Sequence, residues 1–506
     1  MSDRRRYKRP APERPQPQNP EGLPETEKSA EPDRCPLYRK CGGCQLQNMA
    51  YDRQLHWKQS LCERLLGKFH AVEPILGMEK PYHYRNKVQA AFGVSRQGQT
   101  ISGVYQSSTH RIVPVSHCMI EDETADAIIV TIRSLLKSFR IRPYDEYTGT
   151  GLLRHVLVKR GFSSGQVMVV LVTATPILPA KNRFVEALRK IHPEITTVIQ
   201  NVNGKFTSLV LGEQEKVLFG PGYIEDTLCG CVFRISAKSF YQINPVQTEK
   251  LYGRAIELAA LTGNETVIDA YCGIGTIGLI AARHAKKVIG VELNNDAVRD
   301  AIANARRNGI QNARFYCADA GQFLVDMADS GEQADVVMMD PPRAGSDEAF
   351  LSSIVRLSPA RVVYISCNPE TQARDFTYLT RSGYTVRHIQ PVDMFPHTNH
   401  VETVAVLSRK SATNTFIPVT VSPKDMGLDE AKAQPTYENI RKYVKETHGL
   451  TVSTLNIAQM KTECGLEMEC DRSGGKQQPK CPPEKREAIL DAFRHFGMIE
   501  DGTLEE

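Results

Sequence analysis

VIDAYCGIGTIGL, residues 267–279, joins a short apolar strand to three glycines, Gly273, Gly275 and Gly278, in the spacing GxGxxG. Glycine permits a sharp turn after the strand, and the helix that follows presents its first amides to a ligand. From this stretch to about residue 410, apolar strands alternate with helix-like runs, which predicts a doubly wound parallel α/β sheet. Ligands bind such sheets at the carboxyl ends of the strands, so we expect the functional residues there.

Acidic residues accompany the strands of this predicted sheet. Asp269 precedes the glycines, Glu292 ends the next strand, Asp319 follows the third strand, and DPPR at 340–343 follows the fourth. One interpretation is a dinucleotide enzyme, with Glu292 on a ribose hydroxyl. We favour S-adenosylmethionine, because several carboxylates suit a sulfonium and an amino group but repel a pyrophosphate.

A cysteine ends the next predicted strand, in SCNP at 366–369. We expect the N-terminus of the following helix to hold Cys367 as a thiolate. A thiolate beside a methyl donor suits methylation at pyrimidine C5, since addition at C6 makes C5 nucleophilic. The C5 proton must then be removed, and Glu402, at the start of an apolar strand, is the candidate base. The alternatives are an inert core cysteine and a solvent-facing carboxylate.

A cysteine cluster lies near the N-terminus, in CPLYRKCGGC at 35–44. Cys35, Cys41 and Cys44 supply three thiolates, and Cys62 or Cys118 is the candidate for a fourth. Spacing alone leaves zinc and a 4Fe-4S cluster open. Residues 52–66 follow with helical apolar spacing at Leu55, Trp57, Leu61 and Leu65, which predicts a helix after the cysteine loop.

Length and composition set the overall organisation. With 506 residues, 41% hydrophobic and 24% charged, the chain is expected to form about three domains of an ordinary soluble protein. No long apolar run and no signal-like N-terminus is present, so we expect a cytoplasmic location, no membrane and reduced thiols. We predict five segments: a basic Pro-rich arm at 1–34, a cysteine loop and helix at 35–80, a mainly β domain at 81–240, the α/β catalytic domain at 241–410, and a helical extension at 411–506.

Basic residues suggest contacts with an anionic partner, although the net charge is only +5. The arm is either a solubilising tail or a contact with RNA phosphates. In the β domain the candidate phosphate contacts are Arg85, Lys87, Arg154, Lys159 and Arg160. In the extension, Cys464, Cys470, Cys481 and His495 allow a zinc site, but the spacing favours a plain helical module.

Taken together, residues 35–408 resemble the RNA uracil-C5 methyltransferases, which form 5-methyluridine, and in particular their bacterial 23S ribosomal RNA branch. The resemblance rests on CPLYRKCGGC, SFYQINPVQTEKLY, DAYCGIGTIGL, GVELN, CAD, DPPRAG, SCNP and HTNHVETVAVL, in that order. It implies a class I methyltransferase fold, a central β domain that binds RNA, and a 4Fe-4S cluster. By position it implies Cys367 as nucleophile and Glu402 as base, and the following ligands: Cys35, Cys41, Cys44 and Cys118 for the cluster; Gln242, Tyr271, Glu292 and Asp340 for S-adenosylmethionine; Asp319 for its adenine.

The sequence therefore predicts a monomeric enzyme that methylates C5 of a uridine in 23S ribosomal RNA through a covalent adduct. Many members of the family carry a small β-barrel before the cluster, whereas the 34 residues before Cys35 are too few and too Pro-rich to form one. Transfer RNA is the alternative substrate, and a non-catalytic iron-sulfur RNA-binding factor is the alternative class.

Overall fold

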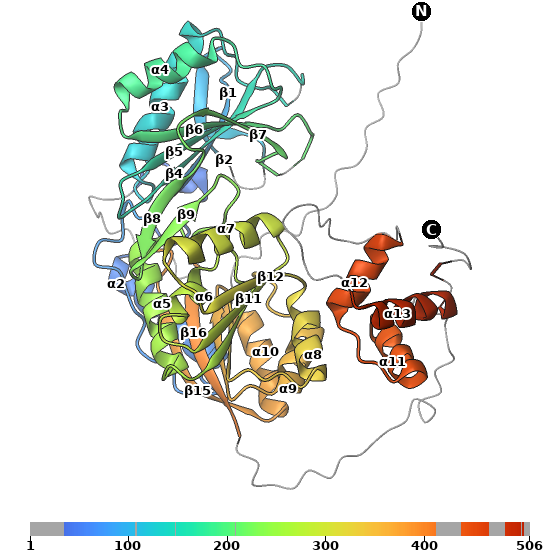
Figure 1. The fold of residues 1–506 in the computed structure, drawn as a ribbon. Helices are drawn as coiled ribbons and strands as arrows, with labels where there is room; N and C mark the ends of the chain where they lie inside the picture. The colour runs from blue at the N-terminus through green and yellow to red at the C-terminus, as the bar shows by residue number, and fades with distance from the viewer. Residues whose placement is uncertain are drawn as a thin grey trace, which may run out of the picture. The chain divides into compact units, whose positions relative to one another are not determined.

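The computed structural model of this protein describes residues 35–106, 109–146, 148–207, 209–410, 437–464, 481–496 and 498–499. The chain divides into two compact units, residues 1–411 and 412–506, and each is described by itself (Figure 1). The predicted basic arm at 1–34 lies outside the described residues. Within the described residues, no helix is long and apolar enough to cross a membrane.

The cysteine module opens the first unit with two helices, α1 (Tyr38–Cys41) and α2 (Tyr51–Leu66). The predicted helix is present, but a different face of it is buried. Gln54, Lys58, Cys62 and Leu66 are the buried residues, each four positions after the last, so they form one stripe along the helix. Half of this stripe is polar, which requires partners in the structure that the apolar pattern did not predict.

The central domain is a seven-stranded sheet with the order β3-β2-β1-β4-β5-β6-β7. Helices α3 (Glu123–Ser138) and α4 (Lys181–Ile191), which the sequence analysis did not predict, pack on one face of it. The opposite face of its central strands joins the core of the catalytic domain, so β5 is buried along its whole length. The strands are β1 (Lys87–Val94), β2 (Thr100–Tyr105), β3 (Ile112–Pro114), β4 (Leu153–Arg160), β5 (Val167–Thr173), β6 (Ile195–Val202) and β7 (Gln214–Phe219), followed by the hairpin β8 (Ile224–Leu228) and β9 (Cys231–Ile235).

The catalytic domain is a second seven-stranded sheet with the order β12-β11-β10-β13-β14-β16-β15 (Figure 1). Its first five strands run parallel and β16 is antiparallel to both neighbours. The strands are β10 (Thr266–Ala270), β11 (Lys287–Glu292), β12 (Ala313–Cys317), β13 (Val336–Met339), β14 (Arg361–Ser366), β15 (Tyr384–Val392) and β16 (Glu402–Arg409), and the helices are α5 (Pro245–Ala259), α6 (Thr276–Ala281), α7 (Asn295–Arg307), α8 (Ala320–Asp329), α9 (Glu348–Leu357) and α10 (Pro369–Arg381).

Successive residues of these strands pack into two different cores. Val267 belongs to a core with α5, α6 and α7, whereas its neighbour Ile268 belongs to a core with α8, α9, α10 and the end of α2. This alternation, with period two, is what a sheet covered on both faces requires. The predicted doubly wound α/β sheet is confirmed, but it is mixed and not wholly parallel, because β16 runs antiparallel to β14 and β15. The strand order reverses between β10 and β13, so the ligand crevice lies at their carboxyl ends.

The second unit is a small helical module. Its described helices are α11 (Tyr437–His448), α12 (Thr454–Glu463) and α13 (Pro483–His495), in agreement with the predicted helical module. They enclose their own apolar core, which includes Ile440, Ile457 and Phe493. Of the residues of the zinc alternative, Cys464 and Cys481 border this core, His495 stacks on Tyr443 at 4.1 Å between ring centroids, and Cys470 lies outside the described residues.

Candidate active site

The antiparallel pairing of β14 with β16 brings the proposed nucleophile and base together. Ser366 pairs with Thr403, so Cys367 and Glu402 are neighbours at the end of one strand and the start of the other. Opposite residues in such a ladder have Cβ atoms about 5 Å apart. Asp340, at the end of β13, completes the group, since its charge and that of Glu402 both act on the Cys367 thiol. Three predicted site residues therefore meet at one edge of the sheet.

The Cys367 thiol is not held as a thiolate in this structure, contrary to the expectation. Burial and the charges of Glu402 and Asp340 raise the pKa of Cys367 to about 11, while the Arg343 guanidinium lowers it. The N-terminus of α10 is also engaged already, because the Asn368 side chain accepts from the backbone N–H of Glu370. Any lowering of the Cys367 pKa by the helix N-terminus is smaller than the rise caused by burial and by the two carboxylates. The thiol is therefore protonated at neutral pH.

The two carboxylates beside Cys367 hold protons more tightly than ordinary acids. Glu402 is 4% exposed, and burial together with the Asp340 charge raises its pKa well above the usual range, with Arg343 opposing. Burial raises the pKa of Asp340 to about 7. Buried carboxylates whose charges act on each other cannot both ionise without cost, so ionisation of one raises the pKa of the other. A carboxylate with a raised pKa binds a proton more strongly than an ordinary one, which suits a group that removes a proton from a substrate.

The glycine-rich loop borders open space at the carboxyl end of β10. Gly273 and Gly275 take left-handed angles, φ 55° and 82°, and a Cβ on Gly273 would meet no heavy atom within 4 Å. Gly278 is needed for close packing, because a Cβ there would lie 2.7 Å from Asp269 Oδ2. The loop therefore leaves room for a ligand in front of Gly273 while α6 packs tightly behind it.

The surroundings of Asp269 indicate which charge a ligand at this place would carry. Its Oδ2 accepts from the Gly278 N–H at 2.7 Å, but its buried Oδ1 has no hydrogen-bond partner among the described residues. Burial raises the pKa of Asp269 to about 8, and the charges of Asp340 and Glu292 add to the effect. Several acids crowded around one crevice favour a cationic ligand. The sulfonium and amino group of S-adenosylmethionine fit this arrangement.

The other predicted donor-binding residues line the same crevice from several elements. Glu292 accepts from the backbone N–H groups of Gly273, at 3.1 Å, and Asn294, at 2.8 Å. The Tyr271 ring packs on Phe350 with centroids 5.0 Å apart. Burial raises the pKa of Tyr271, and the charge of Asp319, the N-cap of α8, adds to this rise. These contacts place both acids and the tyrosine around the glycine loop.

Gln242 is linked to the residues of the glycine loop by Tyr252, which the sequence analysis missed. Tyr252, buried on α5, hydrogen-bonds with the side chains of Gln242 and Thr276. The charges of Asp340 and Asp269 also act on its hydroxyl. The signal for this residue was present in the motif SFYQINPVQTEKLY, whose helical part puts Tyr252 on the buried face of α5.

The four cysteines implied by the resemblance line one pocket in the cysteine module. Cys35, Cys41, Cys44 and Cys118 border it together with apolar residues such as Leu37, Val115 and Ile120. Cys62, the other candidate for the fourth position, is instead fully buried on α2 and is not part of the pocket. Burial and the neighbouring thiols Cys41 and Cys35 raise the pKa of Cys44 to about 12. A positive metal centre would offset the cost of such thiolates.

Two of the basic residues expected to contact RNA have structural roles instead. Arg154 donates to the carbonyls of Asn203 and Lys205, both at 2.7 Å, and is 5% exposed. Lys159 donates to the carbonyls of Ser236 and Ser239 at 2.8 Å, and burial lowers its pKa to about 7. The prediction of phosphate contacts is wrong for both, because their charged groups are satisfied by backbone carbonyls inside the protein.

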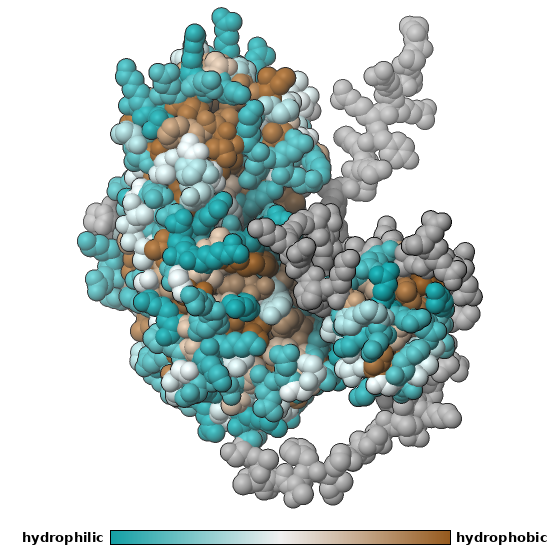
Figure 2. All heavy atoms as spheres, in the orientation of Figure 1, coloured by the Kyte–Doolittle hydropathy of each residue, from teal (hydrophilic) through white to brown (hydrophobic). Residues whose placement is uncertain are grey.

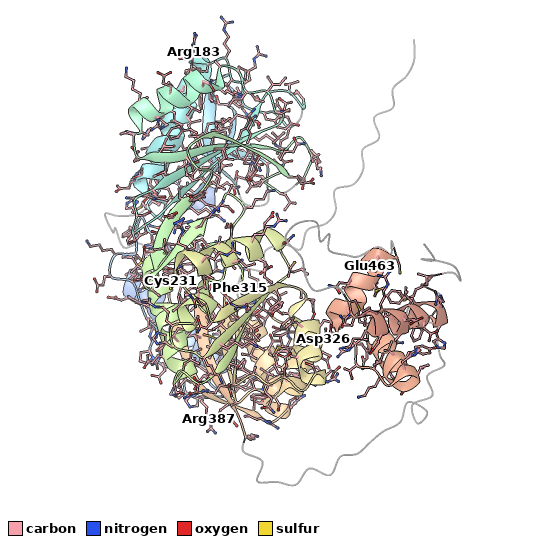
Figure 3. All side chains as sticks on the ribbon, in the orientation of Figure 1. Arg183, Cys231, Phe315, Asp326, Arg387 and Glu463 are labelled. Atoms are coloured by element: carbon pink, nitrogen blue, oxygen red, sulfur yellow. The ribbon has the colours of Figure 1, made fainter. Side chains whose placement is uncertain are left out.

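A different group of cations borders an open hollow of about 630 Å³ beside α4. Lys181, Arg183 and Lys216 line it, and the nearby Lys216 ammonium lowers the pKa of Lys181. None of the three forms an ion pair with a carboxylate of the described residues. Figure 3 shows Arg183 projecting from the α4 end of the central domain, and Figure 2 shows apolar side chains among hydrophilic ones on the same domain. Unpaired like charges around a hollow favour an anionic ligand.

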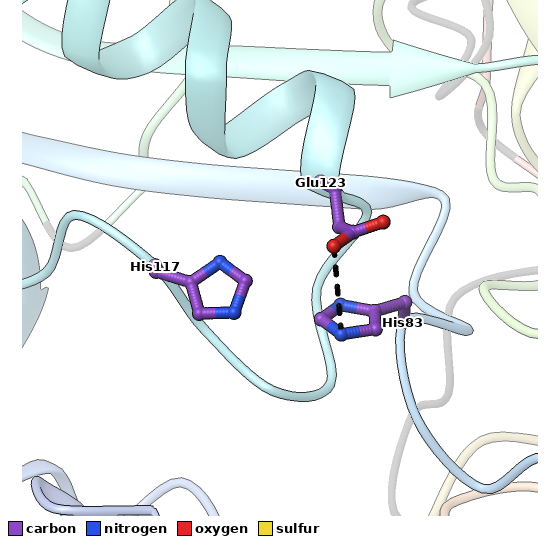
Figure 4. A group of neighbouring side chains, drawn as sticks. All are labelled: His83, His117 and Glu123. Carbon is purple, nitrogen blue, oxygen red and sulfur yellow. Dashed lines mark ion pairs between the residues drawn. The ribbon is translucent and has the colours of Figure 1, made fainter.

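The sequence analysis did not predict the group of His83, His117 and Glu123, whose side chains face one another (Figure 4). His117 also lines the cysteine pocket. The ligand atoms of His83, His117 and Glu123 lie within 4.8 Å of one another. His83 Nδ1 is 2.9 Å from the carbonyl of Glu121, and His83 Nε2 is 3.9 Å from Glu123 Oε1. The Glu123 side chain is 70% exposed and that of His117 is 62% exposed, so this group is a solvated ion pair with a neighbouring ring.

Comparison with known proteins agrees with this site. The family described as tRNA (Uracil-5-)-methyltransferase matches residues 50–410. An uncharacterized RNA methyltransferase of Halalkalibacterium halodurans is 48% identical over 391 residues, which cover 76% of this chain and 85% of that protein. Another from Clostridium acetobutylicum is 43% identical over 382 residues, covering 74% and 83%.

A solved structure shares the fold. It is the Pyrococcus abyssi tRNA (uracil-54, C5)-methyltransferase in complex with S-adenosyl-L-homocysteine, with 28% sequence identity and a TM-score of 0.61, and the match covers 72% of this chain and 85% of that one. The family match gives the uracil-5 activity, and the relatives named as RNA methyltransferases and the acidic residues around the glycine loop are consistent with it. The chain belongs to the RNA uracil-C5 methyltransferase family and is an S-adenosylmethionine-dependent RNA (uracil-5) methyltransferase.

Proposed function

We propose that this enzyme forms 5-methyluridine in 23S ribosomal RNA, with Cys367 as the nucleophile and Glu402 as the base. The observation that carries the proposal is the meeting of a thiol and a buried carboxylate at the donor crevice, across the β14–β16 ladder. An amine or hydroxyl attacks a methyl donor directly, so its methylation has no use for a thiol nucleophile. Both the thiol and the carboxylate are needed at a pyrimidine carbon, where addition and proton removal must take place on the same ring.

The chain's residues divide the reaction into two stages. S-adenosylmethionine, when bound, supplies an electrophilic methyl group. The Cys367 thiol gives its proton to solvent water as RNA binds, assisted by Arg343, which already lowers its pKa. Its sulfur bonds to C6 and moves electron density to C5, which takes the methyl group. Glu402 then removes the C5 proton, the S–C6 bond breaks, and the double bond of the ring is restored, leaving 5-methyluridine and S-adenosylhomocysteine. The target base must leave its stack to reach this crevice.

For the donor, the proposal assigns the residues that surround the glycine loop. Gln242, Tyr271, Glu292 and Asp340 bind S-adenosylmethionine, and Asp319 lies at the adenine. The unpartnered Oδ1 of Asp269 and the open space before Gly273 support a cationic ligand at this place. The raised pKa values of Asp269 and Asp340 imply that donor binding displaces protons from these carboxyls, since a cation favours their ionised forms.

The proposal also places a 4Fe-4S cluster on Cys35, Cys41, Cys44 and Cys118. All four line one pocket, which supports a shared metal centre. Among the described residues, the cysteines form no group with three ligand atoms within 4.8 Å of one another. The sulfurs around a single tetrahedral zinc ion stand about 3.8 Å apart, so the wider spacing favours a cluster of several metal atoms.

Anaerobic purification is expected to yield a brown protein with about four iron atoms per chain. Cys118→Ala should lose most of the iron, because it removes one of the four ligands. Cys62→Ala is the matched control, since Cys62 lies outside the pocket, and should keep the iron content of the wild type. Zinc in place of iron, or equal iron in both variants, contradicts the assignment.

Contact with RNA is proposed at the hollow beside α4. Its unpaired cations, Lys181, Arg183 and Lys216, supply charge for phosphates far from the crevice. The basic arm, and Arg85, Lys87 and Arg160, remain further candidates, although Arg160 is engaged by Asp122 at 2.5 Å. A base-flipping enzyme needs such distal contacts, because they hold the RNA while one nucleotide is extruded.

The substrate is tested by mapping 5-methyluridine in RNA from cells that lack this protein. We expect loss of the modification at one or more 23S positions, restored by the wild-type gene but not by a Cys367→Ala gene. Transfer RNA is the second candidate, favoured by the named substrate of the solved relative. Loss confined to transfer RNA would overturn the 23S proposal, and restoration by the Cys367→Ala gene would indicate a non-catalytic role.

A further inference from the structure

The segment that delivers Glu402 to the active site is held by the cysteine module. Residues 393–401 connect β15 to β16, whose first residue is Glu402. Although α2 lies more than 300 positions earlier in the chain, its polar stripe binds this segment at several points. These contacts account for the buried polar residues on α2, which the donor site and the cysteine pocket do not use.

The first contact is a fully buried ion pair. Lys58 Nζ lies 2.5 Å from Asp393 Oδ1, with both side chains 0% exposed, and it also donates to the carbonyl of Phe395 at 3.0 Å. The second carboxylate oxygen of Asp393 accepts from the Tyr51 hydroxyl at 2.7 Å. The Lys58–Asp393 ion pair therefore holds the segment in one geometry. Separating the two groups would leave an uncompensated charge in the protein interior, which is strongly destabilising.

The second contact is a paired interaction between Gln54 and His397. Gln54 Oε1 accepts from the backbone N–H of His397 at 2.9 Å, and Gln54 Nε2 lies 3.1 Å from His397 Nδ1. Burial lowers the pKa of His397 to about 4, so the ring is neutral and its Nδ1 accepts from the amide. The carbonyl of His397 accepts from the N–H of Leu46, two residues after Cys44.

This part of the segment needs such support. His397 has φ +67°, a left-handed conformation that costs free energy for a residue other than glycine and persists only where the surroundings enforce it. On the other side, Asn244 and Gln247 of the α5 region hold the carbonyls of Met394 and Asp393. Further support comes from the Tyr84 hydroxyl, which donates to the carbonyl of Pro396 at 3.0 Å, and from the Tyr82 ring, which stacks on His397. Loss of the α2 contacts would leave these in place but remove the two side chains that fix Asp393 and the strained His397, five residues before Glu402.

We infer that Lys58 and Gln54 are positioning residues for the base Glu402, and that the cysteine module serves as its support. The inference rests on the proposed function, which assigns the proton removal to Glu402. It predicts that these residues affect the step after methyl transfer more than the binding of RNA or donor. A misplacement of about 1 Å at a reacting group costs about 100-fold in rate.

The test uses the full-length enzyme with Gln54→Leu and with the double variant Lys58→Met/Asp393→Leu, which removes the pair without leaving a lone buried charge. Gln59→Leu is the matched control, because Gln59 lies on the same helix but binds Glu63 and the backbone of Ile75 instead. We expect kcat to fall about 10- to 100-fold in both test variants, with KM for RNA and donor within about twofold of the control. The methylated protein–RNA adduct should accumulate, and the iron content should match the control.

Gln54→Leu with the kcat of Gln59→Leu would overturn the inference. So would an equal loss of adduct formation and turnover, since that result indicates general damage to the fold. Glu402→Gln, measured alongside, separates the two proposals. If Glu402→Gln accumulates adduct and Gln54→Leu does not, the positioning role is wrong while the proposed function stands. If Glu402→Gln fails to accumulate adduct, the proposed function itself is wrong.

Discussion

Cys367→Ala is expected to abolish 5-methyluridine formation, with a loss of about 10³-fold or more in rate, because C5 of uracil does not attack a methyl donor until C6 carries a nucleophile. The variant should still bind S-adenosylmethionine, since the acids of the crevice are intact. Tritium transfer from labelled donor to RNA measures the activity, and calorimetry measures donor binding.

The covalent bond itself is detected with RNA that contains 5-fluorouridine. Fluorine cannot leave as a proton, so the wild-type enzyme should stop as an adduct that survives denaturing electrophoresis, and Cys367→Ala should form none. Cys229→Ala is the matched control, because Cys229 is half-buried like Cys367 but lies in the β8–β9 turn, and it should form the adduct normally. An undiminished adduct with Cys367→Ala contradicts the mechanism.

Glu402→Gln is expected to separate addition from release. The amide cannot take the C5 proton, so product formation should fall about 10²- to 10⁴-fold while a methylated protein–RNA adduct accumulates on ordinary uridine. Glu370→Gln, an exposed carboxylate in the first turn of α10, is the control and should turn over normally. Electrophoresis of the adduct, together with nucleoside analysis by mass spectrometry, distinguishes trapping from simple inactivity.

The role of Glu402 as the base can also be tested by the pH dependence of adduct breakdown. Burial and the Asp340 charge raise the pKa of Glu402, so the ionised form that accepts a proton becomes more abundant as pH rises. The rate at which the wild-type adduct decays should therefore increase with pH through this raised pKa. In Glu402→Gln the same dependence should be absent. Normal turnover of this variant would remove Glu402 from the role of base.

Much of the site was predictable because its residues follow local signals. The glycines of 273–278, the acid of DPPR and the cysteine of SCNP each come directly after an apolar strand. Parallel strands end at the same edge of a sheet, so strand-end residues gather whatever the details of packing. Cys367 and Glu402 also meet for a local reason, since adjacent strand ends become neighbours once β14 and β16 pair.

Other features were not predictable, because they depend on neighbours from distant parts of the chain. The expected thiolate of Cys367 is a protonated thiol, since the burial and the two carboxylates that decide its pKa come from packing. Arg154 and Lys159 look like surface cations in the sequence, yet folding directs them onto backbone carbonyls. Propensity and pattern do not encode such desolvation, which is a property of the assembled interior.

The sequence by itself determined the α/β class, the strand-end chemistry and the cysteine loop, because periodicity and turn residues act over a few positions. Cysteine spacing left Cys62 and Cys118 open, the family resemblance implied Cys118, and the tertiary structure places Cys118 in the cysteine pocket. Only the tertiary structure revealed that Lys58 and Gln54 bind the segment leading to Glu402. The physical reason is that both depend on contacts between residues far apart in the chain, whose partners are chosen by three-dimensional packing and not by spacing.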